Sequence, residues 1–406
     1  MHDPASRLLA IRARTILSLA GEVPARGARL FAPLKKMDNA VLLVRDGLVE
    51  EVRPWAAGHL PPGTEVRDVG PVCLAPAVVN AHTHIQLSWL AGQTLWHKGF
   101  AAWLGSLIPL LRSGQAETVA QAITEACEGV AAMGTCHLGD VGGSLRGSVS
   151  CVQAACRAAQ IEVTHFCEWF GYGPPFTDDL FPWPQHCRQE IENNPALAAD
   201  CAPAGHALYS TGPTVLQAAH RFCMEQGRPF SFHLAESPEE TELLTSGQGP
   251  LHSCYAGSVL PEGWQPPGLR PLAYAASLGL LGRGSLAVHG VQLDAQEVDV
   301  LAASGTALCL CPRSNRNLAV GTAPVRALLE SGALLCLGTD GLTSNSDLDV
   351  RQEAVYLREH MDIPPEALVR MLTINGAAAL GLAGSVGSLA PGVPARFCLL
   401  PEALTY

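Results

Sequence analysis

In the stretch Val78-Val79-Asn80-Ala81-His82-Thr83-His84, two histidines stand at the end of an apolar run. Residues 78–81 are predicted to form a buried strand, and side chains two apart in a strand point to the same side. His82 and His84 can therefore present two ligands to one metal ion. Histidines that cap a helix or occupy a turn are the alternative, and the clear strand before them argues against it.

Five further stretches end in a residue suited to metal-assisted hydrolysis. They are Gly205-His206, Phe232-His233-Leu234-Ala235-Glu236, Val288-His289-Gly290, Cys311-Pro312-Arg313-Ser314-Asn315 and Gly338-Thr339-Asp340. Imidazole nitrogens and carboxylate oxygens are good Zn²⁺ ligands, and a catalytic site leaves one position open for water. A single buried metal site is the economical explanation of all these stretches.

Strand candidates alternate with helix-like segments through the middle of the chain. The strands end near Asn80, Asp140, Glu168, Ala207, Leu234, Gly290, Cys311 and Thr339, and helix-like segments include 117–133, 150–160, 215–226, 295–304 and 324–331. This alternation is the signature of a (β/α)₈ TIM barrel, an α/β fold whose active site lies at the C-terminal strand ends. The metal-site stretches fall at that end.

The two chain ends have a different pattern. Residues 41–44 and 48–52 flank Asp46-Gly47, which is a hairpin signal, and residues 397–400 read as a short strand. We expect residues 1–72 and 385–406 to form one small β-sandwich domain, with the barrel spanning residues 73–384.

Composition argues against several partners and locations. A balance of 26 basic against 37 acidic residues gives a net charge of −11, which disfavours nucleic acid or an anionic membrane as a partner. No apolar stretch is long enough to span a membrane, and Met1-His2-Asp3-Pro4 lacks the basic start of a signal peptide. The 14 cysteines are expected to be reduced, buried residues of a cytoplasmic protein.

At these residues the chain resembles the amidohydrolase superfamily, in its branch of cytosine deaminases, chlorohydrolases and deaminases of adenosine derivatives. The motifs that carry the resemblance are residues 80–84 for the first barrel strand, 232–236 for the fifth, 288–293 for the sixth, 311–315 for the seventh and 337–340 for the eighth. Residues 315–325 and the compact C-terminus resemble aminodeoxyfutalosine deaminases within that branch. The chain departs from them at Gln86, where they commonly carry Glu, and at Gly341, where they carry Ser.

The resemblance implies a role for each strand-end residue. His82, His84, His233 and Asp340 would bind one divalent ion per chain, with Zn²⁺ favoured and Fe²⁺ as the alternative. Glu236 would shuttle the proton, while His289 and Asp340 would orient the attacking water. The residues predicted to contact the substrate are His206, Gln86, Trp96, Glu168, Arg313 and Asn315.

The insertion at residues 89–111 follows the first strand and so passes over the barrel mouth. Trp96 and Trp103 offer flat apolar faces for a heterocycle there, and His97 and Lys98 offer donors. The competing interpretation is that both tryptophans anchor the insertion to the barrel or to a second subunit.

The predicted activity is hydrolytic deamination. Metal-bound hydroxide would attack a ring carbon of an aminopurine nucleoside of the aminodeoxyfutalosine or methylthioadenosine type. A guanine or cytosine deaminase and a triazine chlorohydrolase are alternatives, and a non-catalytic metal-binding barrel is a remote one. The expected partners are this small heterocyclic substrate and further copies of the chain in a homo-oligomer.

Overall fold

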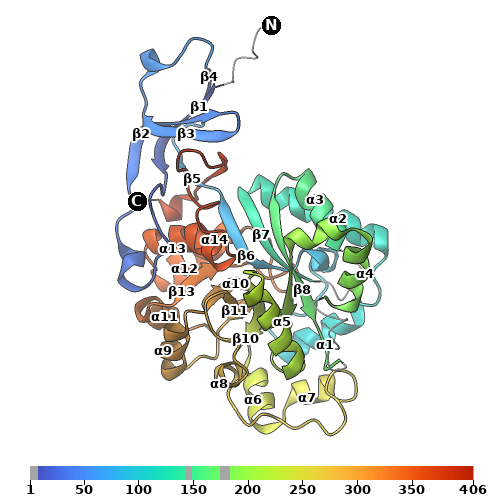
Figure 1. The fold of residues 1–406 in the computed structure, drawn as a ribbon. Coiled ribbons are helices and arrows are strands. Elements are labelled where there is room, and N and C mark those ends of the chain that lie inside the picture. Colours follow the sequence, from blue (N-terminus) through green and yellow to red (C-terminus); the bar gives the residue numbers. More distant parts are fainter. Residues whose placement is uncertain (1–7, 143–148, 174–182, 406) are drawn as a thin grey trace.

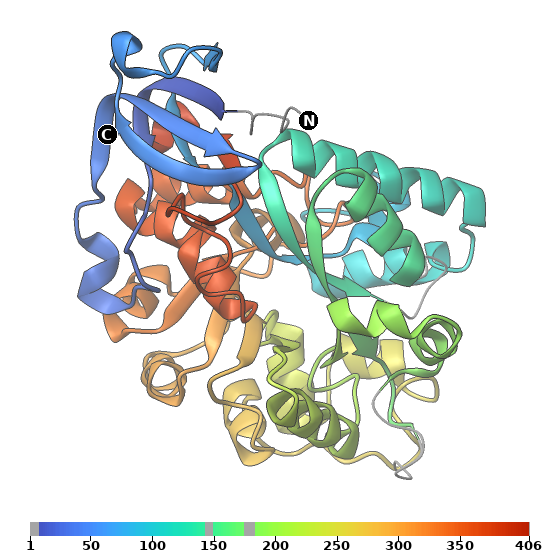
Figure 2. The same ribbon diagram turned by 45° about the horizontal axis from the view of Figure 1, so that its top comes forward.

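The computed structural model describes residues 8–142, 149–173 and 183–405, and its centre is a ring of eight parallel strands (Figures 1 and 2). The strands are β6 (Val78–Thr83), β7 (Thr135–Gly142), β8 (Glu162–Trp169), β9 (Cys201–Gly205), β10 (Phe230–Leu234), β11 (Ser285–His289), β12 (Ala307–Leu310) and β13 (Leu334–Leu337). Nearly all their residues are buried, as expected for parallel strands covered on both faces. The predicted TIM barrel is confirmed.

Two seams close the ring. The strands are hydrogen-bonded in the orders β6-β7-β8-β9 and β10-β11-β12-β13, and single parallel bridges join Thr83 to Asp340 and Ala207 to His233. Gly338 permits the first seam, because a Cβ atom there would lie 2.7 Å from the backbone oxygen of His82. Both seams therefore meet at residues predicted to bind the metal.

Helices cover the outside of the barrel. Those that the sequence predicted are α2 (Ala116–Ala132), α3 (Val149–Ala158), α5 (Pro213–Glu225), α9 (Ala295–Ser304) and α11 (Val325–Ser331). The others are α1 (Phe100–Leu110), α4 (Gln185–Asn193), α6 (Pro238–Ser246), α7 (Pro250–Tyr255), α8 (Pro271–Ser277), α10 (Pro312–Leu318), α12 (Val350–Met361), α13 (Pro365–Leu372) and α14 (Ile374–Ala379). In the described parts of the chain, no helix combines the length and apolar character needed to cross a membrane.

The two chain ends meet in one six-stranded sheet, which lies at the opposite end of the molecule from α6 and α7 (Figure 1). Its strands are β1 (Leu8–Leu17), β2 (Lys36–Arg45), β3 (Leu48–Pro54), β4 (Glu65–Asp68), β5 (Cys73–Pro76) and β14 (Phe397–Leu399). The predicted hairpin joins β2 to β3 through Asp46 and Gly47, whose φ angles of 51° and 80° suit a tight turn.

This sheet differs from the predicted domain in two respects. Its strands form one hydrogen-bonded layer, and the described residues contain no second sheet facing it, so the predicted sandwich is not confirmed. In addition, β5 begins at the predicted barrel boundary but pairs with β1 and β14 of the small sheet.

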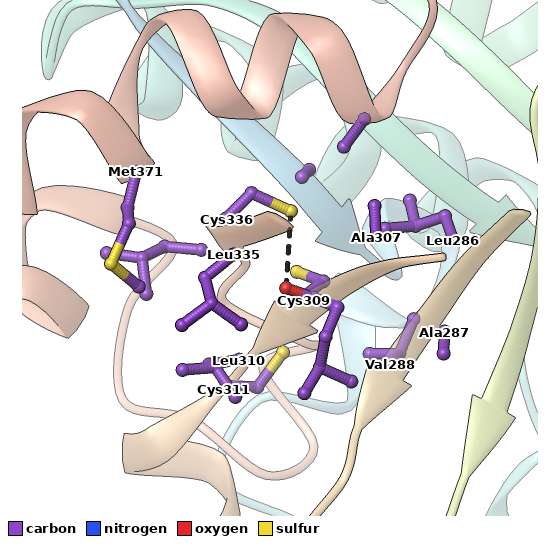
Figure 3. Close-up of a cluster of buried hydrophobic side chains, with 14 of the residues drawn as sticks. Leu286, Ala287, Val288, Ala307, Cys309, Leu310, Cys311, Leu335, Cys336 and Met371 are labelled. Atoms are coloured by element: carbon purple, nitrogen blue, oxygen red, sulfur yellow. Dashed lines mark hydrogen bonds between the residues drawn. The ribbon is translucent and has the colours of Figure 1, made fainter. Parts of the chain in front are cut away.

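Cysteines belong to the apolar core beneath the site. Figure 3 shows Cys309, Cys311 and Cys336 among leucine and valine side chains of β11, β12 and β13. The thiol of Cys336 donates to the backbone oxygen of Leu308 at 3.7 Å. None of the 14 cysteines forms a disulfide and twelve are buried, as the sequence predicted.

Candidate metal centre and active site

The four predicted metal ligands come together at the C-terminal ends of the barrel strands. His82 lies in β6 and His84 directly follows it, His233 lies in β10, and Asp340 follows β13. Oδ1 of Asp340 lies 3.4 Å from Nε2 of His84 and 3.7 Å from Nε2 of His82. The ring centroid of His233 lies 5.0 Å from that of His82 and 5.5 Å from that of His84. One ion at their centre could be reached by all four.

His289, at the end of β11, lies close both to the four predicted ligands and to Glu236. One ring nitrogen of His289 lies within 4.8 Å of ring nitrogens of His82 and His233, and also of carboxylate oxygens of Glu236 and Asp340. The distance from Nε2 of His289 to Oε1 of Glu236 is 3.5 Å.

Backbone and side-chain acceptors fix the orientation of three histidine rings. The Nδ1 atoms of His84, His233 and His289 lie 3.1 Å from the oxygen of Val141, 2.7 Å from the oxygen of His206 and 2.9 Å from Oδ1 of Asn315. Because these acceptors carry no hydrogen, each Nδ1 donates, and each Nε2 keeps its lone pair. Such contacts orient metal-binding histidines in proteins generally.

His82 provides the test of whether these residues fit a metal. Its side chain is buried, and neither ring nitrogen has a hydrogen-bond partner among the described residues. Nε2 of His289 is likewise buried without such a partner. Unpaired buried polar atoms are unfavourable, and a cation between these nitrogens and Asp340 would satisfy them.

Two serines hold the carboxylate of Asp340 in place. The hydroxyls of Ser314 and Ser344 donate to Oδ2 at 2.6 and 2.7 Å, which leaves Oδ1 facing the histidines. Asp340 and His289 both have positive φ angles, 59° and 77°, in the left-handed region that non-glycine residues rarely adopt. Backbone strain of this kind is concentrated at functional sites.

The pKa values of the site favour neutral imidazoles beside an ionised carboxylate. Burial lowers the pKa of His82 to about 4 and that of His233 well below its usual value. Burial alone would raise the pKa of Asp340, but the neighbouring histidines lower it well below its usual range. Neutral imidazole and ionised carboxylate are the forms that bind a cation.

Glu236 is a buried acid beside the proposed ligands. Burial, followed by the charges of Asp340 and Glu240, raises the pKa of Glu236 well above its usual value. Its backbone N–H donates to Oε2 of Glu240 at 2.7 Å. A carboxyl group with a raised pKa can both hold and release a proton near neutral pH.

A cavity of about 710 Å³ opens onto the metal-ligand group. Its lining includes His206 and Glu168, as predicted, together with Glu236 and His289. Ligand-type atoms of Glu168, His206 and His233 lie within 4.8 Å of one another. Burial lowers the pKa of His206 to about 3, and its Nδ1 contacts the hydroxyl of Ser210.

The structure places the other four residues predicted to contact substrate outside this lining, and gives each of them a different neighbour. Asn315 orients His289. Arg313 binds Asp347 at 2.6 Å. The indole N–H of Trp96 donates to the backbone oxygen of Thr343 at 2.8 Å. Gln86 is buried against Gly142. Of the six residues, His206 and Glu168 line the cavity, and substrate contact stays a prediction for all six.

Several lining and positioning residues were not among the predicted substrate contacts. Trp103, which the sequence offered beside Trp96, lines the cavity, and so do Phe170 and Tyr255, which the sequence did not single out. Asp140 accepts from the backbone N–H of Ile85 at 2.8 Å and pairs with buried His165 at 2.9 Å, which fixes the turn after His84. For Glu240, Ser314 and Ser344, the sequence offered only closeness in the chain to a predicted site residue.

Comparisons with known proteins place the chain in one family. Residues 73–405 match the amidohydrolase family. A 5-methylthioadenosine/S-adenosylhomocysteine deaminase of Nitratidesulfovibrio vulgaris is 30% identical over 381 residues, covering 89% of this chain and 80% of the relative. An aminodeoxyfutalosine deaminase of Deinococcus radiodurans is 27% identical over 321 residues, covering 76% of this chain and 73% of the relative.

A solved structure has the same fold. It is an adenosine deaminase from Xanthomonas campestris with bound zinc, with a TM-score of 0.74 and 22% identity, covering 96% of this chain and 83% of the other. The family match over residues 73–405 and the relative of 30% identity identify the chain as a member of the amidohydrolase family and a hydrolase that acts on C–N bonds.

Proposed function

We propose that this protein is a metal-dependent hydrolytic deaminase that releases ammonia from an aminopurine nucleoside. The observation that carries the proposal is the convergence of His82, His84, His233 and Asp340 with buried Glu236 at one end of a cavity. The names of the relatives, deaminases of methylthioadenosine, S-adenosylhomocysteine and aminodeoxyfutalosine, support this class of substrate.

His82, His84, His233 and Asp340 would hold one divalent cation. Three neutral imidazoles and one carboxylate would leave a 2+ site with a net charge of +1. When bound, the cation supplies Lewis acidity that lowers the pKa of water towards about 7. Zn²⁺ suits this set of nitrogen and oxygen donors, and Fe²⁺ is the alternative.

Glu236 moves the proton in this proposal. Its carboxylate takes a proton from the attacking water and delivers it to a ring nitrogen of the substrate. After water has added to the amino-bearing carbon, Glu236 takes the proton of the new hydroxyl and gives it to the amino group. The C–N bond then breaks, ammonia leaves, and the ring carbon becomes a carbonyl. The raised pKa of Glu236 suits a group that must carry a proton in one step and give it up in the next.

His289 and His206 orient the reactants. Because Nδ1 of His289 donates to Asn315, Nε2 of His289 can accept a hydrogen from the attacking water, and this Nε2 lies 3.5 Å from Oε1 of Glu236. His206 and Glu168 lie on the cavity wall beside His233, where they can bond the heterocycle or its sugar.

Ammonia release from a panel of aminopurines, nucleosides, guanine, cytosine and a chlorinated triazine tests the proposal. Deamination of an adenosine-type nucleoside with the highest kcat/KM supports it. Preferential turnover of a free base, or chloride release from the triazine, would show that another member of the panel defines the activity. A cytoplasmic location and a homo-oligomer remain predictions.

A further inference from the structure

The cavity at the metal-ligand group has two chemically different parts. The end beside the ligands contains all the lining histidines and carboxylates, which are His84, Glu168, His206, His233, Glu236, His289 and Asp340. A second part is bounded by α1 and is apolar: Phe100, Trp103, Leu104, Leu107, Ile108 and Leu111 all line it. The histidines and carboxylates that could bind a polar part of the substrate are therefore concentrated beside the predicted metal ligands.

Helix α1 supplies most of the side chains of this apolar part. The indole N–H of Trp103 donates to the backbone oxygen of Thr343 at 2.9 Å, which ties the first turn of α1 to the loop after Asp340. Later residues of the helix lie progressively farther along its axis. With a rise of about 1.5 Å per residue, the seven steps from Trp103 to Leu110, the last residue of α1, span about 10 Å.

Arg112 follows the C-terminal end of α1 and belongs to the cavity lining. It is the only lysine or arginine among the described lining residues. Its exposed side chain makes no hydrogen bond or ion pair with the parts of the chain that the structure describes. The wall formed by α1 and the residues after it therefore combines an apolar surface with one permanent positive charge, whose five donors suit a carboxylate.

We propose that the substrate carries, on the side away from its reacting carbon, an apolar arm that ends in a carboxylate, and that Arg112 binds this carboxylate. The inference rests on the proposed deaminase function and selects one class among its substrates. An uncharged short arm would leave Arg112 unused. A zwitterionic arm would bring an ammonium group to a wall whose described residues include no carboxylate, and desolvating that group there is unfavourable.

Three nucleosides with the same adenine base separate these classes. Aminodeoxyfutalosine ends in an aromatic ring with a carboxylate, methylthioadenosine has a short uncharged arm, and S-adenosylhomocysteine has a zwitterionic arm. The measurement is kcat and KM for all three with wild-type enzyme, Arg112→Gln and Arg112→Lys. Arg221→Gln is the matched control, because Arg221 is an exposed arginine on α5 outside the cavity lining.

The wild-type enzyme should prefer the carboxylate-ended nucleoside. Arg112→Gln should raise its KM by about 10- to 100-fold, the range for one hydrogen bond to a charged group, with kcat little changed. Arg112→Lys should recover part of the loss, since it restores the charge without the planar donors. Methylthioadenosine turnover should be the same in all variants, and Arg221→Gln should match wild type throughout.

Two results would overturn the inference while leaving the proposed function intact. One is deamination of the nucleosides with an unchanged KM for the carboxylate-ended substrate in Arg112→Gln. The other is a wild-type preference for S-adenosylhomocysteine. If no nucleoside in the set releases ammonia, the proposed function and the inference both fail.

Discussion

Oε2 of Glu240 accepts a hydrogen bond of 2.7 Å from the backbone N–H of Glu236, the residue proposed to move the proton. Glu240 is buried, and the backbone N–H groups of Ala235 and Ser237 also face its carboxylate. Ala235 has a positive φ of 51°, so the turn that carries Glu236 is held in a conformation that its sequence does not favour by itself. We therefore expect Glu240 to act on the proposed reaction by positioning Glu236.

Removing the Glu240 acceptor should lower kcat without removing the metal. We expect Glu240→Ala to lower kcat by about 100-fold, as a displacement of about 1 Å does in other active sites, and Glu240→Gln to lower it less because its amide oxygen still accepts. KM and metal content should change little. Steady-state kinetics with metal analysis checks this, and Glu242→Gln, on the exposed face of α6, is the control. Equal kcat in Glu240→Ala and the control would contradict the positioning role.

Glu236 itself should be far more sensitive. Glu236→Gln keeps the shape of the side chain but cannot take up a proton, so kcat should fall by about 10²- to 10⁴-fold or more. Metal content and substrate binding should be retained, which isothermal titration against an unreactive substrate analogue can measure. A variant that keeps more than about a tenth of wild-type kcat would show that another group moves the proton.

The barrel and the ligands could be predicted from sequence because each depends on a local pattern. Apolar runs that end in His82, His233 or Asp340 predict both a strand and its functional end, and the barrel places all such ends at one rim. The small sheet was predicted less well. The pairing partners of β1, with β2 on one edge and β4 and β5 on the other, depend on contacts between distant segments that strand patterns do not specify.

Substrate contacts were the least predictable part of the site. Arg313 and Asn315 follow a strand end, as metal ligands do, but α10 begins at Pro312 and turns their side chains towards Asp347 and His289. Trp96 and Trp103 look equivalent in the sequence. Only the placement of α1 over the barrel mouth distinguishes the residue that lines the cavity from the one that does not.

Metal content should distinguish the ligands from His289. Purified wild-type protein should contain one divalent ion per chain, and His82→Ala and His233→Ala should lose it. His289→Ala should keep the ion but lose activity, because its proposed partner is the water between it and Glu236. Elemental analysis per chain checks this. Loss of the ion in His289→Ala to the same extent as in His82→Ala would make His289 a ligand.

Glu353 should make stability depend on pH. It is buried and accepts from the backbone N–H of Arg313 at 2.9 Å and from Nδ2 of Asn345 at 2.8 Å. Burial raises the pKa of Glu353 to about 8, despite the opposing charge of Arg313, from a usual value of 4.5. The folded state therefore binds this proton more tightly than the unfolded state does. The stabilisation that the proton provides is lost as the pH rises from 4.5 towards about 8.

The variant Glu353→Gln mimics the protonated form, so its stability should not fall with rising pH on account of this residue. Between pH 6 and pH 8.5, the melting temperature of wild type should fall more than that of Glu353→Gln, and the variant should be the more stable protein at pH 8.5. Thermal unfolding at both pH values checks the difference. Parallel curves for the two proteins would mean that Glu353 stays ionised in the folded state.

The two tryptophans of the insertion at residues 89–111 should give different phenotypes. Both indole N–H groups donate to the backbone oxygen of Thr343, at 2.8 Å from Trp96 and 2.9 Å from Trp103, but only Trp103 lines the cavity. Trp96→Phe removes one hydrogen bond of about 1 kcal/mol and should lower the melting temperature by about 2 °C, with relative rates across substrates unchanged. Trp103→Leu also removes an aromatic wall and should raise KM and alter substrate preference.

Melting curves and kcat/KM for the three nucleosides measure both effects. If Trp96→Phe changes preference as strongly as Trp103→Leu does, the insertion recognises substrate through Trp96 as well, and the division of roles is wrong.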